Sequence, residues 1–184
     1  MTEENRKPAI ETIYILPTGN EIQNGVVLDL DSPEVMGQLL RAWPRAEVTR
    51  LCPLADEEEA ILEKLREVAA LRPDLIVLIG GSGGGHRHSD SLGKDYTQSA
   101  LELYLKDKSV REIYGKNGHL WCKLLCGRMG NCLLINVPGP FHEARAAIEA
   151  FIAAAGQGGG LKEINQAMAE AVFSQYPPGR AESR

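Results

Sequence analysis

The 184-residue chain lacks a surplus of basic residues, a long apolar run and a paired-cysteine motif. Lys and Arg number 20 against 25 Asp and Glu, giving a formal net charge of −5, whereas proteins that bind a nucleic-acid backbone need a cationic surface. No apolar stretch approaches the ~20 residues that span a bilayer, and the polar start MTEENRKP is unlike a signal peptide. We therefore expect a cytoplasmic protein that binds neither nucleic acid nor membrane.

The four cysteines, Cys52, Cys122, Cys126 and Cys132, form no CxxC pair. A structural zinc site needs a tighter spacing and clustered histidines. The pattern therefore favours small buried apolar side chains in a reducing compartment over zinc ligands.

What the chain does contain is an alternation of short β-branched runs and amphipathic segments, which is typical of βαβ units. The pattern predicts strands at 11–16, 46–52, 74–79, 119–126 and 131–137, with helices between and after them. We expect an α/β fold in three layers, with a mainly parallel sheet and helices on both faces. The length suits one core, so we predict a single domain over 11–175 with tails at 1–10 and 176–184.

Helix starts are predicted at two polar clusters. Asp31 or Ser32 can cap a helix whose first turn contains Pro33, a position where the missing N–H has no partner to lose. Asp56 is followed three residues later by Glu59, the spacing of a capping box.

Three glycine-bearing loops follow predicted strands, at 17–25, 80–97 and 137–140. Open α/β sheets bind ligands outside the carboxyl ends of their strands. Glycine lets backbone amides approach an anion closely, and the helix that follows adds a positive dipole. The first and last loops could each be simple turns, and GGSGGG could be a linker. Together they predict a site for a phosphorylated small molecule.

Five segments occur in the order of a known family: PTGNEIQNGVVLDLDS, LADEEEAILEKL, LIVLIGGSG, KDYTQSAL and CKLLCGRMGNCLLINVPG. They resemble the molybdopterin-binding domain of molybdenum-cofactor biosynthesis, a family that includes molybdopterin adenylyltransferases and the corresponding domain of molybdenum insertases. The resemblance runs from about Glu11 to Ala155.

This resemblance implies a molybdopterin-binding protein of molybdenum-cofactor biosynthesis, with Mg²⁺-ATP-dependent adenylylation of molybdopterin as the expected activity. The alternative is a non-catalytic carrier of molybdopterin or the finished cofactor. A third possibility is a nucleotide pyrophosphatase-like activity, as in the related domain of nicotinamide-mononucleotide deamidases. The family also implies a homotrimer and contacts with other molybdenum-cofactor proteins.

The resemblance places Asp56 and Asp95 at the two acidic positions, as catalytic residues and magnesium ligands, since Mg²⁺ prefers few carboxylates plus waters and phosphates. The residues expected to border phosphate, nucleotide or pterin are Thr18, Gly19, Glu21, Gly80, Gly81, Ser82, Gly83, Thr97, Pro138 and Gly139. Asp56 could instead cap its helix, and Asp95 could cap the helix that starts near Thr97.

The chain also departs from the family. Asn20 replaces an acid, Lys94 and Lys123 replace arginines and lose the bidentate fork, and residues 84–93 are inserted. In the insertion, His86, His88 and Asp90 could form a metal corner, Arg87 and the histidines could form a cationic lid, or the loop could stay solvated until a ligand arrives. The lone histidines, His119 and His142, are interpreted as structural.

Overall fold

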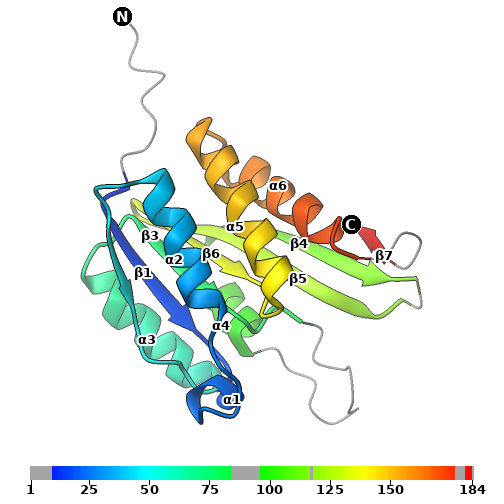
Figure 1. Ribbon diagram of the computed structural model, residues 1–184, viewed down its shortest axis with the longest axis horizontal. Coiled ribbons are helices and arrows are strands. Elements are labelled where there is room, and N and C mark those ends of the chain that lie inside the picture. The colour runs from blue at the N-terminus through cyan, green and yellow to red at the C-terminus, as the bar shows by residue number, and fades with distance from the viewer. Residues whose placement is uncertain (1–9, 84–95, 117, 177–180, 184) are drawn as a thin grey trace, which may run out of the picture.

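A computed structural model describes residues 10–83, 96–116, 118–176 and 181–183 (Figure 1). The strands are β1 (Thr12–Pro17), β2 (Glu47–Arg50), β3 (Leu75–Ile79), β4 (Asp107–Gly115), β5 (Leu120–Met129), β6 (Cys132–Val137) and β7 (Ala181–Ser183). The helices are α1 (Asn20–Gln23), α2 (Asp31–Ala42), α3 (Glu58–Ala70), α4 (Tyr96–Tyr104), α5 (Phe141–Gly156) and α6 (Leu161–Phe173).

The strands of this described part form one sheet in the order β2-β1-β3-β6-β5-β4-β7. Neighbours from β2 to β6 run parallel, and those from β6 to β7 run antiparallel. Helices cover both faces (Figure 1), so the α/β class and the layered architecture expected from the sequence are confirmed. Because β1, β3 and β6 are parallel, the loops that follow them all leave the same edge of the sheet, here called the carboxyl edge.

Each face of the sheet has its own apolar core. One core packs β-strand side chains against α2, α5 and α6, with Leu39, Phe151 and Met168 fully buried. The other packs them against α3 and α4, with Leu65 and Leu101 fully buried. All five residues of β3 are buried, as expected of a parallel strand covered on both faces.

A buried amide fixes the central strands to α4. Asn136 on β6 is fully buried and accepts a hydrogen bond at Oδ1 from the Leu125 amide, 2.6 Å away. Its Nδ2 donates to the Lys123 carbonyl at 3.2 Å and to Gln98 Oε1 at 3.3 Å. This network joins β5, β6 and the first turn of α4, and so places the start of α4 beside the carboxyl edge.

Both predicted helix caps are wrong. Helix α2 begins at Asp31 without a side-chain cap from its N-cap residue Leu30, and it is Asp29 Oδ1 that accepts the Ser32 amide, at 2.9 Å. Helix α3 begins at Glu58, also without such a cap. The Asp56 carboxylate accepts a hydrogen bond from the Asn20 amide, at 3.3 Å.

The second half of the sheet contains strands that the sequence pattern did not indicate. Strand β4 was not predicted. Residues 181–183, which fall in the expected tail at 176–184, pair with β4 as β7. Cys52 is exposed, contrary to expectation, whereas Cys122, Cys126 and Cys132 are buried. Burial raises the pKa of the Cys126 and Cys132 thiols to about 12, so both stay protonated and unreactive.

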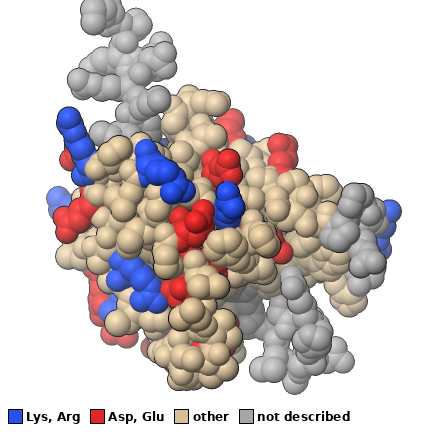
Figure 2. Space-filling model, viewed as in Figure 1, with Lys and Arg blue, Asp and Glu red and all other residues tan. Residues whose placement is uncertain are grey.

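The surface carries mixed charge. On the face seen in Figure 2, acidic and basic side chains are interspersed, and the lobe at the lower edge, over α1, is almost free of charge. Four aliphatic side chains next to α1 are well exposed: Val26 (79%), Val27 (47%), Leu28 (77%) and Leu30 (56%). Among the described residues, no helix is both long enough and apolar enough to cross a membrane.

Candidate functional site

The three glycine-bearing loops meet at the carboxyl edge. The Thr18 amide donates to the Ile79 carbonyl at 2.8 Å, and the Gly80 amide donates to the Val137 carbonyl at 3.0 Å. A Cβ built on Gly80 would lie 2.9 Å from the Thr18 carbonyl oxygen, and one built on Gly139 would lie 3.8 Å from the Gly80 Cα. Gly80 therefore lies between the other two loops and is too close to Thr18 to carry a side chain.

Several glycines of these loops have positive φ angles. Gly19, Gly80 and Gly81 have φ values of 132°, 94° and 61°, a region that L-residues adopt only with strain. Gly19 and Gly80 are buried, whereas Gly139 is exposed and Pro138 before it is buried. The glycines thus allow the backbones of the three loops to lie close together. Gly139 is the part of this arrangement that reaches the surface.

The two threonines predicted at the site join loops to one another. The Thr97 hydroxyl donates to Thr18 Oγ1 at 3.2 Å, and the Thr18 hydroxyl donates to the Ile79 carbonyl at 3.1 Å. Both residues are buried. This hydroxyl chain links the loop after β1, the end of β3 and the start of α4.

Ser82 also faces inward. It is 2% exposed, and the Cys122 thiol donates to its hydroxyl with an S–O distance of 3.7 Å. The Ser82 carbonyl accepts the Lys123 amide at 2.7 Å, and Gly83 forms an antiparallel bridge with Cys122. The glycine loop after β3 therefore lies along the start of β5. It occupies the edge of β5 that pairs with β6 from Cys126 onward.

Lys123, one of the residues that departs from the family pattern, is already paired. Its Nζ lies 2.5 Å from Glu102 Oε1 and 3.3 Å from Glu112 Oε1. Burial lowers the pKa of this ammonium, but the two carboxylates outweigh it and hold the pKa above its usual value. The charge of Lys123 is thus neutralised within the fold.

Two carboxylates gather beside the loop after β1. The Asp56 amide donates to Asn20 Oδ1 at 3.1 Å, completing a reciprocal pair with the Asn20 amide. A Cβ on Gly19 would lie 2.8 Å from Glu21 Oε1, so the Glu21 carboxylate covers that glycine. Burial raises the pKa of Asp56, the Asn20 hydrogen bond lowers it, and the negative charge of Glu21 raises it, with a net increase. The carboxylates of Asp56 and Glu21 repel each other, and a bound cation would reduce this repulsion.

The start of α2 contributes polar groups that the sequence reasoning assigned only to capping. Asp31 Oδ1 and Ser32 Oγ are buried and have no hydrogen-bond partner among the described residues. Asp29 next to them forms an ion pair with Arg50 at the end of β2, at 2.7 Å. Burial first, and then the charge of Asp29, raises the pKa of Asp31 to about 6. Because buried polar atoms are normally bonded, these two oxygens mark a locally unfavourable arrangement.

Asp31→Asn should therefore stabilise the protein at high pH. The folded-state pKa of Asp31 lies above its ordinary value, so its contribution to stability is fully present below about pH 4 and is lost as the pH rises through about 6. After allowance for partial exposure, we expect the variant to gain about 1 kcal/mol at pH 8 and nothing at pH 4. Urea denaturation at both pH values measures this difference, and an equal effect at both would contradict it.

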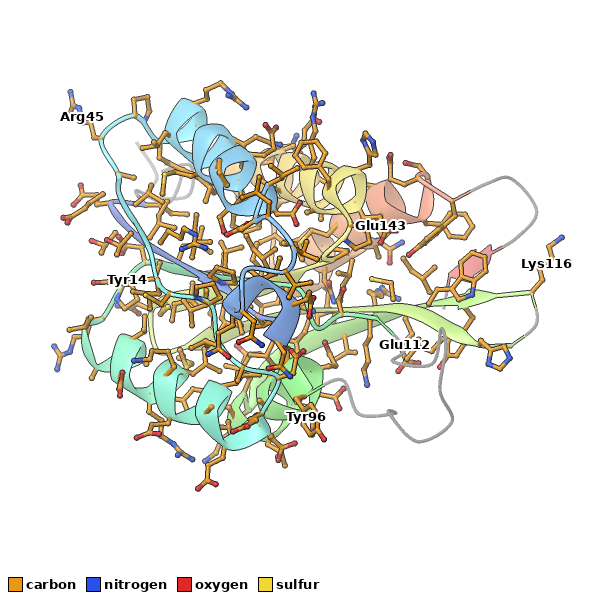
Figure 3. All side chains as sticks on the ribbon, turned by 60° about the horizontal axis from the view of Figure 1, so that its bottom comes forward. Tyr14, Arg45, Tyr96, Glu112, Lys116 and Glu143 are labelled. Atoms are coloured by element: carbon orange, nitrogen blue, oxygen red, sulfur yellow. The ribbon has the colours of Figure 1, made fainter. Side chains whose placement is uncertain are left out.

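The remaining sequence-predicted residues are only partly placed. Asp95, Lys94 and the insertion with His86, Arg87, His88 and Asp90 lie outside the described residues. His119 and His142 are exposed, and the His142 ring contacts Phe141 edge-on, with centroids 5.6 Å apart. Within the described ranges, no group of three or more His, Cys, Asp or Glu could hold a metal. In Figure 3, the labelled Tyr96 and Glu143 mark the starts of α4 and α5 around this edge.

A comparison with known families decides the relationship of this chain. The family described as "Probable molybdopterin binding domain" matches residues 14–157. The chain belongs to this family. The match spans all three glycine-bearing loops and confirms the resemblance seen in the sequence.

Solved structures with this molybdopterin-binding fold are similar throughout their length. The molybdopterin biosynthesis enzyme MoaB from Thermus thermophilus is 20% identical with a TM-score of 0.63, over 89% of this chain and 97% of that one. The protein CinA from Thermoplasma acidophilum is 19% identical with a TM-score of 0.60, over 80% and 99%. The tungsten cofactor synthesizing protein MoaB from Pyrococcus furiosus is 12% identical with a TM-score of 0.59, over 80% and 93%. At these identities the likeness shows the fold alone. No curated protein matches the chain in sequence.

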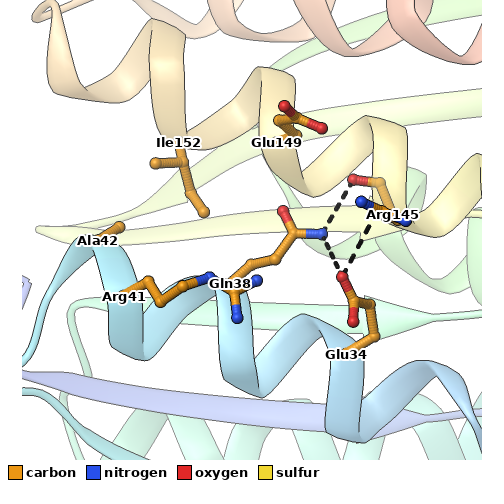
Figure 4. A pocket seen from close by; sticks show the side chains of 7 residues that line it. All are labelled: Glu34, Gln38, Arg41, Ala42, Arg145, Glu149 and Ile152. Atoms are coloured by element: carbon orange, nitrogen blue, oxygen red, sulfur yellow. Dashed lines mark hydrogen bonds and ion pairs between the residues drawn. The ribbon is translucent and has the colours of Figure 1, made fainter.

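The molybdopterin-binding domain also has an open groove away from the loops. It lies between α2 and α5, has a volume of about 360 Å³ and is lined by Glu34, Gln38, Arg41, Ala42, Arg145, Glu149 and Ile152 (Figure 4). Gln38 Nε2 donates to Glu34 Oε1 at 3.0 Å and to the Arg145 carbonyl at 3.3 Å. Arg145 Nε lies 3.6 Å from Glu34 Oε1. Glu34, Gln38 and Arg145 thus bond to one another within the groove.

Proposed function

We propose that the carboxyl edge binds the phosphate of molybdopterin through backbone amides of the converging loops. The observation that carries this proposal is the position of Gly80, held against Thr18 on one side and Gly139 on the other. Backbone N–H groups at such glycine turns, together with the N-termini of the following helices, bind anions without side-chain charge. Membership of the molybdopterin-binding family supports the pterin as the ligand.

In this proposal the backbone binds the ligand and the hydroxyls support the backbone. Thr18, Ser82 and Thr97 are buried, and their hydroxyls are engaged with one another, with the Ile79 carbonyl or with the Cys122 thiol. The contacts to phosphate would come from the amides of 81–83 and from Gly139. Such a cradle costs little reorganisation when the ligand binds.

Asp56 and Glu21 fit a magnesium ion. Burial first, and then the negative charge of Glu21, raises the pKa of Asp56. Mg²⁺ is commonly held by one or two carboxylates together with waters and substrate phosphates. When bound, the ion would neutralise phosphate charge. Asp95, assigned as the second acidic ligand by resemblance, stays part of this proposal.

The proposed reaction is transfer of an adenylyl group from ATP to the terminal phosphate of molybdopterin. An oxygen of that phosphate attacks the α-phosphorus of ATP, the bond from this phosphorus to the oxygen bridging to the β-phosphate breaks, and pyrophosphate leaves with the electron pair. For phosphoryl chemistry of this kind the protein mainly positions two polyanions and stabilises charge. The loops would hold one anion and the acidic pair the cation that accompanies the other.

Incubation with molybdopterin, ATP and Mg²⁺ tests the activity through pyrophosphate release. We expect turnover by the wild type and a loss of at least about 10- to 100-fold in Asp56→Asn, because removal of a residue that only supports a metal ligand already costs that much. Glu59→Gln removes an exposed carboxylate from the first turn of α3 and should keep full activity.

The outcomes of this assay separate the alternatives. Tight molybdopterin binding without pyrophosphate release would support the carrier function. Nucleotide cleavage that does not require molybdopterin would support the pyrophosphatase-like activity. An absence of molybdopterin binding would contradict the proposal altogether.

A cytoplasmic homotrimer that contacts other molybdenum-cofactor proteins is also proposed, from the family alone. The exposed aliphatic side chains at 26–30 are the surface that we assign to such protein contacts, because exposed apolar patches mark interaction sites.

A further inference from the structure

A β-bulge lies at Trp121, where the backbone of β5 runs beside the glycine loop. Strand β5 pairs Cys122 with Ile113 of β4 but Leu120 with Tyr114, so Trp121 is the extra residue of the pair. Successive strand residues normally point to opposite faces, yet Trp121 and Cys122 both pack against the core under α5 and α6. Bulges re-aim side chains in this way and are frequent next to active sites.

The bulge lies directly against the loop after β3. Gly83 bridges Cys122, and a Cβ built on Gly83 would lie 3.9 Å from the Trp121 carbonyl oxygen. The adjoining Lys123 amide donates to the Ser82 carbonyl at 2.7 Å. Trp121 is therefore fixed next to the last described residues of the proposed phosphate cradle.

The indole itself packs against Tyr176, which connects it to α5. Trp121 makes an edge-on contact with Tyr176, with ring centroids 5.1 Å apart, and the Tyr176 hydroxyl donates to Glu143 Oε2 at 3.2 Å. Glu143 is in the first turn of α5, which follows that loop. The aromatic pair thus connects β5, whose backbone lies beside the glycine loop, with the first turn of α5, and Trp121 remains half-buried.

We infer that Trp121 is a specificity-determining residue that recognises the ring system of the bound ligand. The inference rests on the proposed function: the backbone cradle holds the phosphate, and the indole contacts a heteroaromatic ring carried on the same molecule. Aromatic side chains stack with such rings or contact them edge to face. The shared chemistry is a phosphorylated heteroaromatic compound, either a purine nucleotide or a pterin phosphate.

Calorimetric titration with three probes tests this role. AMP carries a purine, neopterin 3′-phosphate carries a pterin, and ribose 5-phosphate carries no aromatic ring. We expect one of the two ring-bearing probes to bind the wild type about 10-fold more tightly than ribose 5-phosphate, since one stacked base contributes about 1–3 kcal/mol. The preferred probe identifies which ring lies against Trp121.

Variants at both tryptophans separate recognition from folding. Trp121→Leu should remove the preference and leave ribose 5-phosphate binding unchanged, whereas Trp121→Phe should retain most of it. Trp43, which contacts Phe151 in the core under α2 and α5 with centroids 6.2 Å apart, supplies the control: Trp43→Phe should bind all three probes like the wild type.

Two results would overturn the inference, and they differ in what else they overturn. If all three probes bind the wild type and Trp121→Leu weakens them equally or not at all, the ring contact is wrong and the phosphate site stands. If none of the three binds the wild type, both the ring contact and the proposed phosphate site are wrong.

Discussion

Gly80→Ala should lose ligand phosphate binding by on the order of 100-fold, because the new methyl group would force apart the loops that form the site. Its Cβ would lie 2.9 Å from the Thr18 carbonyl oxygen and 3.0 Å from Thr18 Oγ1. The φ angle of 94° adds backbone strain that an alanine cannot relieve. Together these effects should also lower the free energy of unfolding by roughly 2–4 kcal/mol.

Gly118→Ala is the matched control for this variant. Gly118 has a comparable φ of 79°, but a Cβ there would meet no atom within 4 Å. It should therefore lose about 1–2 kcal/mol of stability from the left-handed backbone alone and keep full ligand affinity. Calorimetric titration with molybdopterin and urea denaturation of both variants give the comparison. Equal affinities for Gly80→Ala and Gly118→Ala would contradict the assigned role of Gly80.

Asn136→Asp should lower the free energy of unfolding by roughly 3–5 kcal/mol at pH 8, since it places an unpaired charge in a buried network. The substitution replaces the Nδ2 donor with an oxygen that faces two acceptors, the Lys123 carbonyl and Gln98 Oε1. Asn131→Asp, at an exposed position next to β6, should change stability by no more than about 0.5 kcal/mol.

The loss in Asn136→Asp should shrink at low pH. Burial would raise the folded-state pKa of the new carboxyl above its unfolded value, so its destabilising effect is present above that folded-state pKa and disappears once both states are protonated. Urea denaturation between pH 4 and pH 8 measures this. A deficit below about 1 kcal/mol at pH 8, or one that grows on acidification, would show that the Asn136 network is not a structural constraint.

The sequence predicted the part of the fold whose segments are apolar by themselves. Strands β3 and β6 are continuous buried runs, and β1 is nearly so. Their parallel arrangement and common carboxyl edge could therefore be foreseen. Strand β4 was missed because most of its side chains are exposed or half-buried. It depends on pairing with β5 and β7, which no local pattern reveals.

The sequence indicated which loops form the candidate site, but not which partners their side chains contact. Glycines after parallel strands indicated where backbone would approach a ligand, and the loops do meet. That Ser82 faces Cys122 depends on how the loop lies along β5. That Asp56 bonds to Asn20 and not to α3 depends on contact between two loops distant in the chain. The bulge at Trp121 likewise arises from strand register.

A crystal structure of the protein with molybdopterin tests the central claim most directly. The phosphate should lie within hydrogen-bond distance, about 3 Å, of backbone nitrogens in 81–83, with Gly80 still packed between Thr18 and Gly139. A phosphate bound elsewhere, for example in the groove between α2 and α5, would contradict the claim that the three glycine loops form the binding site.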